Sequence, residues 1–376
     1  GTFDGQNHTL TLNWDAGYKS DIAPFRRVDG ATIKNLRTEG EIKSSLNFLS
    51  GLVYEAFGTT TISGCISAVN ITSSYNNGGC DVAGIIECVR DNAKVTITDC
   101  VVKGKFHATT EKGRKYMAGF VCNQYGTCTL TNCLYAGENN CSRGYTFCTN
   151  SFGGTTITNC LYAGENNATT GSNTFAANAT INNCYYLNAC GTTQGDRVTE
   201  EQLKNGYVAH KLQGTREETV WGQVLGTDTV PLLTDKIEKR VYEVKFTLNN
   251  EVKATRYANK GQTVSLPTVQ ELLGADYAPN ITYALSFEGN FSASSTVTGN
   301  TTVVANVVFK DISIATKEDW KKFGDYVRRG EGNLNAKLTR NIDLGSEINM
   351  VGDDNNKYSG TFDGQNHTLT LNWDAG

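Results

Sequence analysis

A short phrase recurs through the first half of this chain and constrains its fold more than any other feature. Each copy reads Thr, an aliphatic residue, two polar or small residues, and then Cys or Leu. The copies are ATIKNL (31–36), TTISGC (60–65), VTITDC (95–100), CTLTNC (128–133), TTITNC (155–160) and ATINNC (179–184). Their core threonines lie 24 to 35 residues apart. A unit this short cannot bury its own apolar face, so such units stack on their neighbours.

Two companion phrases complete the repeat. FLSGLV, DVAGII and YMAGFV precede most copies, and RTEGEI, VVKGKF and LYAGEN follow them. Three strand-like segments per period, joined by loops of changing length, predict a right-handed parallel β-helix. Side chains alternate along a strand, so the threonines should face solvent and the aliphatic residues should face the core. The expected core ladder is Ile62, Ile97, Leu130, Ile157 and Ile181.

The position before the final Cys or Leu predicts a bend in every turn. It holds Asn35, Gly64, Asp99, Asn132, Asn159 and Asn183. Asn, Asp and Gly tolerate the left-handed backbone region, so we expect a positive φ at each. A metal-binding role for this column is disfavoured because Gly occurs in it and His does not.

The next position forms a column of cysteines, namely Cys65, Cys100, Cys133, Cys160 and Cys184. Leu36 occupies the same place in another copy, so we interpret the column as buried thiols that fill the core. The spacing expected of a zinc or redox site is absent. Seven further cysteines remain, and Cys184 and Cys190 are close enough in sequence for a local bridge, although pairing cannot be read from sequence.

A second repeat is much longer. GTFDGQNHTLTLNWDAG stands at residues 1–17 and again, unchanged, at residues 360–376, an offset of 360 − 1 = 359 residues. We interpret the chain as slightly more than one period of a tandem array. A helix beginning at Thr199 should cap one end of the strand stack, and a helix beginning at Thr316 should cap the other.

This pattern predicts a mainly β chain in three parts. Residues 1–237 should form the parallel β-helix with its C-terminal cap and without its front cap. Residues 238–310 should form a small α+β spacer domain. Residues 311–376 should supply the capping helix and the first turn of the next β-helix repeat.

YSGTFDGQNHTLT, GATIKNL and the AGxV and TTIxNC phrases resemble the GLUG-motif surface proteins of Bacteroidota and Firmicutes. Residues 241–309 resemble the β-grasp repeats of Listeria and Bacteroides surface proteins, although the usual GW phrase is absent. The resemblance implies secretion to the cell surface, a stalk or adhesin role, and no catalytic residues to carry over. Asp228-Thr229-Val230 resembles a short Bacteroidota O-glycosylation site, so Thr229 is a candidate for modification.

Charge and composition agree with a structural role. The net charge of −4 gives no sign of the basic surface that binds nucleic acid, and no apolar run is long enough to span a membrane. We expect no catalytic residues, no cofactor and no metal. The expected partners are copies of the chain, in tandem or head to tail, and host or cell-surface glycans, in an extracellular or cell-surface location.

Two other functions stay open. The first is a β-helix lyase or hydrolase acting on polysaccharides, with the Asp-Gly-x-x-His turn at His8 as an acid/base pair. A hydrogen-bonded turn explains that sequence better, and no Asp/Glu pair with a neighbouring Arg or Lys recurs on one face. The second is ice binding by outward Thr-x-Thr pairs, although residues 61–63 and 180–182 interrupt the pairs.

Overall fold

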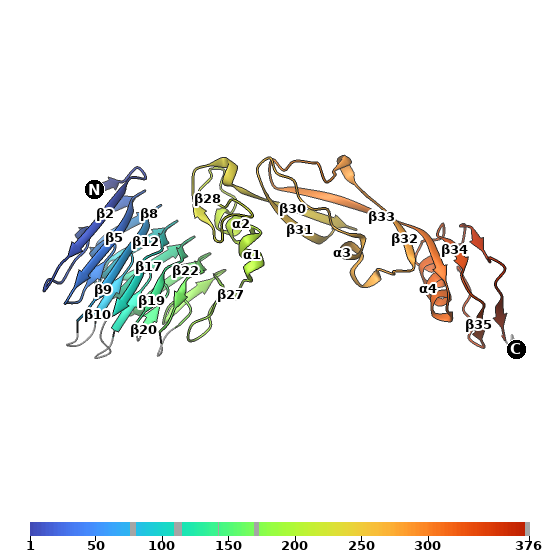
Figure 1. The fold of residues 1–376 in the computed structure, drawn as a ribbon, viewed down its shortest axis with the longest axis horizontal. Helices are drawn as coiled ribbons and strands as arrows, with labels where there is room; N and C mark the ends of the chain where they lie inside the picture. Colours follow the sequence, from blue (N-terminus) through green and yellow to red (C-terminus); the bar gives the residue numbers. More distant parts are fainter. Residues whose placement is uncertain (76–79, 109–114, 142, 169–172, 373–376) are drawn as a thin grey trace. The chain divides into compact units, whose positions relative to one another are not determined.

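The computed structural model describes residues 1–75, 80–108, 115–141, 143–168 and 173–372 (Figure 1). The chain is mainly β, with 45% strand and 11% helix, and its larger sheets contain parallel strands. It divides into two compact units, Gly1–Val241 and Tyr242–Gly376. No helix in the described part of the chain is long and apolar enough to cross a membrane.

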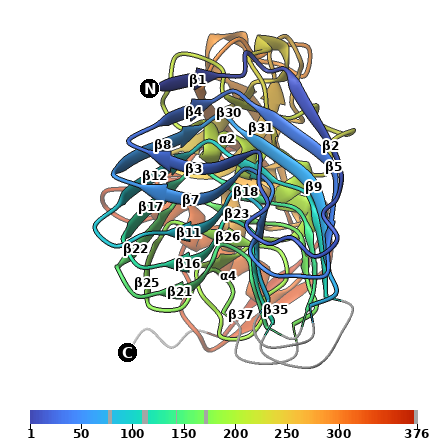
Figure 2. The ribbon, with the colours of Figure 1, turned by 90° about the vertical axis from the view of Figure 1, so that its left-hand side faces the viewer.

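Parallel sheets built from successive copies of the repeat make up most of the first unit. The first sheet has seven strands, seen one below another in Figure 2. They are, in order, β1 (Thr2–Asp4), β4 (Thr32–Lys34), β8 (Thr59–Ser63), β12 (Lys94–Thr98), β17 (Thr127–Thr131), β22 (Thr155–Thr158) and β25 (Ala179–Asn182). Each strand after β1 comes from the next copy of the Thr-aliphatic phrase, so the sequence repeat sets the order of this sheet.

The companion phrases supply the other parallel sheets of this unit. One contains β6 (Leu49–Ser50), β10 (Cys80–Ala83), β15 (Lys115–Ala118) and β20 (Arg143–Tyr145). A second contains β3 (Phe25–Asp29), β7 (Val53–Phe57), β11 (Ile86–Val89), β16 (Val121–Gln124) and β21 (Cys148–Ser151). The third contains β2 (Thr9–Asp15), β5 (Arg37–Ser44), β9 (Ile66–Ser73), β13 (Val101–Val102), β14 (Lys105–Ala108), β18 (Leu134–Tyr135), β19 (Glu138–Asn140), β23 (Leu161–Tyr162), β24 (Glu165–Asn166), β26 (Tyr185–Tyr186) and β27 (Asp196–Arg197).

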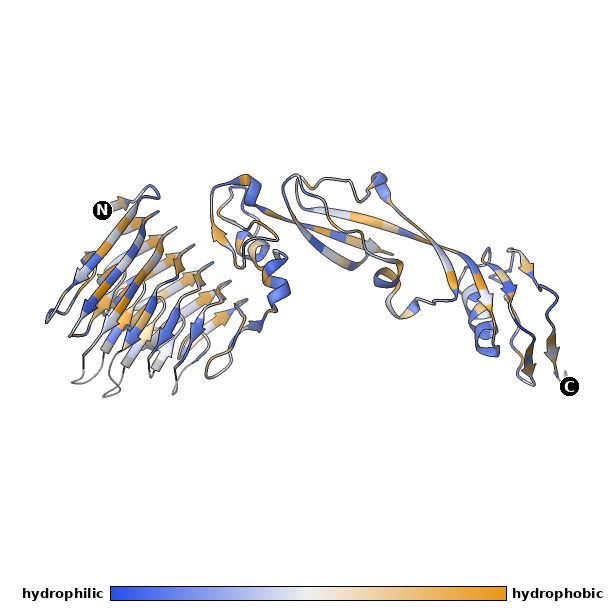
Figure 3. Ribbon diagram, in the orientation of Figure 1, coloured by the Kyte–Doolittle hydropathy of each residue, from blue (hydrophilic) through white to orange (hydrophobic). Residues whose placement is uncertain are grey.

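Apolar side chains stack in register inside these sheets. Ile62, Ile97, Leu130 and Ile157 follow one another across β8, β12, β17 and β22 and are fully buried, and Ile181 is half-buried. Each fully buried aliphatic side chain is worth about 1.5–3 kcal/mol on transfer scales. Figure 3 shows the resulting alternation of apolar and polar residues along the strands.

The predicted left-handed bend is confirmed in every copy. The residue before the final Cys or Leu has φ between 49° and 62°. These residues are Asn35, Gly64, Asp99, Asn132, Asn159 and Asn183. The bend therefore repeats because the residue types that tolerate it repeat.

The segment after the last repeat differs from the expected end cap. α1 (Glu200–Lys204) starts with a capping box at Thr199, and α2 (Tyr207–Gln213) and the hairpin of β28 (Trp221–Gly222) and β29 (Leu232–Leu233) follow. Their apolar residues join one cluster with side chains from four successive strands. Those side chains are Val101, Leu134, Leu161 and Tyr185. The segment therefore covers a flank of the stack, because the phrase after each cysteine points an apolar residue outward.

The second unit combines two apolar clusters around one long strand, β33 (Thr301–Ile314). Its other strands and α-helices are β30 (Val241–Leu248), β31 (Glu251–Asn259), α3 (Val269–Leu273), β32 (Ile281–Phe287), α4 (Lys317–Arg328), β34 (Asn335–Leu338), β35 (Ile342–Gly345), β36 (Phe362–Asp363) and β37 (Leu369–Leu371), with short 3-10 helices η2 (Gly274–Asp276) and η3 (Glu288–Asn290). β30, β34 and β32 all pair with β33. This strand runs across the expected boundary at residues 310/311, so the two sides of that boundary share one sheet.

Candidate functional site

The five cysteines of the repeat lie in the core of the first unit. Each is at most 1% exposed, and none is bonded to another cysteine. The Cys133 thiol approaches the carbonyl oxygens of Thr131 at 3.3 Å and Ile97 at 3.6 Å. Burial raises the pKa of the Cys100 and Cys160 thiols well above its usual range, which keeps them protonated. Protonated, enclosed thiols are poor nucleophiles and poor metal ligands.

The local bridge between Cys184 and Cys190 is not present, since both cysteines are free. The Cys184 thiol donates to the carbonyl oxygen of Ile157 at 3.4 Å, and the Cys190 sulfur accepts a hydrogen bond from Asn166 Nδ2 at 3.1 Å. The two sulfurs therefore have separate partners within the stack.

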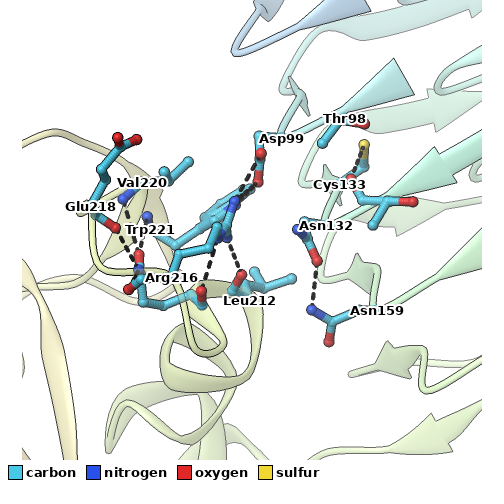
Figure 4. A network of polar contacts seen from close by, with 12 residues as sticks. Thr98, Asp99, Asn132, Cys133, Asn159, Leu212, Arg216, Glu218, Val220 and Trp221 are labelled. Atoms are coloured by element: carbon cyan, nitrogen blue, oxygen red, sulfur yellow. Dashed lines mark hydrogen bonds and ion pairs between the residues drawn. The ribbon is translucent and has the colours of Figure 1, made fainter. Parts of the chain in front are cut away.

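Two residues of the bend column hold the flanking segment (Figure 4). Arg216 Nη1 lies 2.8 and 2.9 Å from the two carboxylate oxygens of Asp99, and Trp221 Nε1 donates to the same carboxylate at 2.7 Å. Farther along, Asn159 Nδ2 donates to Asn132 Oδ1 at 2.6 Å and to the carbonyl oxygen of Lys211 at 3.0 Å. The bend thus turns the chain and also anchors the flanking segment.

Charged residues on the sheet of β3, β7 and β11 were not anticipated. Glu55 is 1% exposed and lies between two arginines, Arg27, whose Nε is 2.6 Å from a Glu55 carboxylate oxygen, and Arg90. Arg27 and Glu55 are register partners on adjacent strands. This is one carboxylate between two arginines, and it is not the recurring Asp/Glu pair with a neighbouring Arg or Lys that sugar chemistry would require. A charged residue inside the apolar runs LVYEAF and IIECV was the available signal.

Glu87 is a second buried carboxyl group on this sheet. It is 1% exposed and accepts a hydrogen bond from Asn123 Nδ2 at 2.7 Å. Burial raises its pKa to about 8, and the nearby charges of Asp81 and Asp21 add to the shift. The group is therefore largely protonated at neutral pH, as a general acid would be. A substrate cannot reach a side chain that is this enclosed, so the arrangement is structural in this conformation.

Threonines form an unbroken column on the outer face of the seven-stranded sheet. Register pairing links Thr2, Thr32, Thr61, Thr96, Thr129, Thr156 and Thr180. All seven are exposed or half-buried. The interruptions predicted within residues 61–63 and 180–182 fall in the neighbouring column, at Ser63 and Asn182. One row of hydroxyl and methyl groups is therefore continuous.

The four histidines do not converge on one site. His8 and His107 are exposed, His210 Nδ1 lies 3.4 Å from the carbonyl oxygen of Val241, and His367 is half-buried in the second unit. Among the residues that the structure describes, no group of three His, Cys, Asp or Glu side chains could hold a metal ion.

The Asp-Gly-x-x-His turn at His8 uses its aspartate for local structure, as a hydrogen-bonded turn would. Asp4 Oδ1 accepts hydrogen bonds from the backbone amide of Gln6 at 3.0 Å and from Asn35 Nδ2 at 3.2 Å, and Lys34 lies beside it. These contacts lower the pKa of Asp4, led by the Gln6 amide. An ionised, engaged aspartate of this kind is a turn residue and not a proton donor to His8.

The two seventeen-residue copies fold into the same turn. Gln6 and Asn7 have φ of 48° and 62°, and their counterparts Gln365 and Asn366 have φ of 46° and 59°. The amide of His8 donates to the Gly5 carbonyl at 2.7 Å, and the counterpart bond at residue 367 has the same length. The turn at residues 5–8 and its counterpart at residues 364–367 thus adopt one local conformation.

The two copies pair through different neighbours. In the first copy, β1 and β2 pair in parallel with β4 and β5, which follow them in the chain. In the second copy, β36 and β37 pair in parallel with β34 and β35, which precede them. The edge of β1 and β2 away from β4 and β5 carries no partner strand among the described residues.

Two more exposed features bear on partners. A groove of about 460 Å³ lies beside the end of β2, and its lining includes Trp14, Asp15, Asp21 and Arg26. Thr229 is exposed, so the candidate glycosylation site is accessible to an enzyme. In the groove, the ring of Trp14 lies beside polar and charged groups, an arrangement suited to binding a sugar.

Comparison with known proteins found no relative. No family model matches the chain, and neither the search of curated proteins nor the search of solved structures returned a match.

Proposed function

We propose that this chain is a structural unit of an extracellular tandem-repeat fibre or adhesin stalk, and that it carries out no catalysis. The observation that carries the proposal is the pair of identical segments, which form one turn and pair with stacked parallel strands in both units. A segment that builds the same turn twice, 359 residues apart, is suited to a repeating rod.

A right-handed parallel β-helix over the repeats of the first unit is part of this proposal. Support comes from the seven-stranded sheet, in which each neighbour belongs to the next repeat and each aliphatic residue sits on its counterpart. The left-handed bend at the same place in every copy also supports a coil of constant shape. Such a coil presents long continuous faces, which suits a stalk.

The absence of catalysis rests on the state of the acidic groups. Glu87 is enclosed, Glu55 is held by two arginines, and Asp4 is engaged in its own turn. Incubation of the chain with a broad panel of polysaccharides should release no sugar. Release that is lost on His8→Ala or Glu87→Gln would contradict the proposal.

The location is tested on the cells that make the protein. Antibodies against the chain should label intact cells, and brief protease treatment of those cells should remove the label. Mass spectrometry of the shed material should find a glycan on Thr229. Detection only after cell lysis would contradict the surface location.

Glycans are the partners that the groove beside Trp14 favours. An array of host and cell-surface glycans should retain the chain, and Trp14→Ala should weaken retention because it removes an exposed aromatic ring from the groove lining. The matched control is Phe152→Ala, which removes an exposed ring elsewhere on the first unit. Equal losses for both variants would contradict the assignment.

Ice binding is a second candidate, favoured by the continuous threonine column. Parallel strands repeat at about 4.8 Å, so the column offers a regular row of hydroxyl and methyl groups. The chain should then show thermal hysteresis, a difference between the melting and freezing temperatures of ice. Thr129→Tyr should abolish this difference, and Ser294→Tyr, on the second unit, should leave it unchanged. No such difference in the unmodified chain would exclude this function.

A further inference from the structure

The two copies of the seventeen-residue segment use different backbone groups. In the first copy, the carbonyl oxygen of Gly1 accepts from Thr32 and the amide of Gly5 donates to Lys34, at 2.9 and 2.8 Å. In the second copy, Thr361, the counterpart of Thr2, accepts from the amide of Ala336 at 2.8 Å. Its own amide donates to the side chain of Asn335 at 3.0 Å. Alternate residues of a strand point their backbone groups to opposite edges, so the two sets do not compete.

The second strand of the segment repeats this division. In the first copy, the carbonyl oxygen of His8 accepts from Arg37 at 3.1 Å. In the second copy, the carbonyl oxygen of Thr368, the counterpart of Thr9, accepts from Ile342 at 2.9 Å. One segment can therefore pair with strands on both of its edges at the same time.

Side-chain burial is complementary in the same way. Leu10 is 42% exposed in the first copy, whereas its counterpart Leu369 is half-buried against the apolar cluster of the second unit. Leu12 is 1% exposed, whereas its counterpart Leu371 is 49% exposed. Each of these two leucine positions is thus more buried in one copy and exposed in the other.

Two glycines of the segment show the same complementarity. A Cβ atom on Gly5 would lie 2.7 Å from the carbonyl oxygen of Asn35, whereas the counterpart Gly364 has open space. A Cβ atom on Gly360 would lie 2.4 Å from the carbonyl oxygen of Leu334, whereas the counterpart Gly1 has open space. Close approach of backbone on each side therefore accounts for one glycine.

We propose that two copies of this chain associate head to tail. Strands β34 and β35 of one copy pair with the open edge of β1 and β2 of the other copy, and β36 and β37 of the first copy detach from β34 and β35 to make room. This inference rests on the proposed structural function and names its partner and register. The incoming strands cover Leu10, and the bound segment then pairs on both edges. Pairing follows the observed register of the second copy, moved by 359 residues, so Ala336 meets Phe3, Lys337 meets Asp4 and Ile342 meets Leu10.

The aromatic side chains fit this exchange. Phe362 lies 5.9 Å from the ring of Trp320 and 6.3 Å from that of Phe323, measured between ring centroids. Phe3, its counterpart, contacts Phe25 at 5.2 Å and is still 46% exposed. Phe3 of one copy can therefore occupy the Phe362 position against Trp320 and Phe323 of another.

Cross-linking tests the register. Lys337→Cys in one preparation of the full chain is mixed with Asp4→Cys in another and oxidised gently. Register partners on adjacent strands lie close enough for a disulfide, so a mixed dimer should form. The control pairs Lys337→Cys with Asp91→Cys, at an exposed residue in the turn between β11 and β12, and should give none. Equal yields from both mixtures would overturn the register.

Sedimentation velocity tests the exchange, because equivalent substitutions should act in opposite directions. The chain's own β36 and β37 compete intramolecularly, at an effective concentration in the mM range. Leu369→Asp weakens this competitor and should increase head-to-tail association about tenfold or more. Leu10→Asp removes the apolar contact of the incoming strands and should reduce association by a similar factor.

Equal effects of Leu10→Asp and Leu369→Asp, or a chain that stays monomeric at all concentrations with both variants, would overturn the inference. Either outcome leaves the structural proposal standing, because repeats can also be joined within one polypeptide. Loss of surface labelling on intact cells would contradict the structural proposal alone.

Discussion

Arg216 Nη1 donates to both carboxylate oxygens of Asp99, a residue 117 positions earlier in the chain, at 2.8 and 2.9 Å. Asp99 also occupies the left-handed bend, with φ of 51°. Asp99 therefore occupies the bend that ends its repeat phrase, and its carboxylate also binds the segment that covers the flank of the sheets.

Asp99→Asn should destabilise the first unit by about 1.5–3 kcal/mol, because it replaces a charge-assisted hydrogen-bond acceptor of Arg216 and Trp221 by a neutral amide. Asn keeps the bend, which separates this effect from backbone strain. Urea unfolding followed by tryptophan fluorescence measures the loss. Asn183→Asp, at the same bend but exposed, is the control and should change stability by less than about 0.5 kcal/mol.

Glu87 should make the first unit less stable as pH rises. Its pKa is raised from the usual value of 4.5 to about 8 by burial, so the folded state holds the proton more tightly than the unfolded state. The stabilisation is complete below about pH 4.5 and is lost as pH approaches 8, with a slope of up to about 1.4 kcal/mol per pH unit. Unfolding free energies from pH 4 to 9 measure it.

Glu87→Gln should reduce that slope, since a neutral amide keeps the enclosed site uncharged; burial also raises the pKa of Asp81, which supplies the slope that remains. The control is Glu165→Gln, at an exposed glutamate of the same unit, which should leave the slope unchanged. An unchanged slope in Glu87→Gln would mean that Glu87 is not the group that titrates.

Cys133→Val should fold normally and lose about 1 kcal/mol of stability, because a fully buried thiol is replaced by an apolar group of similar size. Cys133→Asp should fail to fold, because it buries a charge without a partner. Calorimetry distinguishes the two. Failure of the valine variant to fold would show that the thiol is bonded or that the site tolerates no change of shape.

Gly5→Ala and Gly364→Ala should differ sharply although the sequence around them is identical. A Cβ atom at Gly5 meets backbone of Asn35 and Leu36 at 2.7 Å, which should cost about 1–3 kcal/mol locally. The space around Gly364 is open, so its variant should be nearly neutral. Hydrogen exchange of the β2 and β37 amides gives the comparison. An equal loss of protection in the two variants, each measured against the unmodified chain, would refute the predicted difference.

Much of the first unit could be predicted because its determinants are local. Alternation of threonine and aliphatic residues sets which side of a strand is buried, and Asn, Asp or Gly sets where the chain bends. Ile97 and Asp99 illustrate both rules, since one is fully buried and the other has a positive φ. The helix starts at Thr199 and Thr316 are likewise set by short-range patterns, and each helix begins with a capping box.

The candidate sites depend on which residues of successive repeats become register partners, and these repeats differ in length. Glu55 meets Arg27 and Arg90 because β3, β7 and β11 align, and loops of different length hide that alignment in the sequence. The continuous threonine column has the same origin. The helix after Thr199 was predicted, but the surface that it covers was not, since an amphipathic helix shows that it packs on something and does not show on what.

The sequence by itself determined that residues 5–8 and 364–367 form one kind of turn, because identical residues carry identical backbone preferences. Only the tertiary structure decided that the two copies pair through opposite edges. Backbone hydrogen-bonding groups alternate between the two sides of a strand, so which set is used depends on the strand that lies alongside. Leu10 is open and Leu369 is covered for that reason, although their neighbours in sequence are the same.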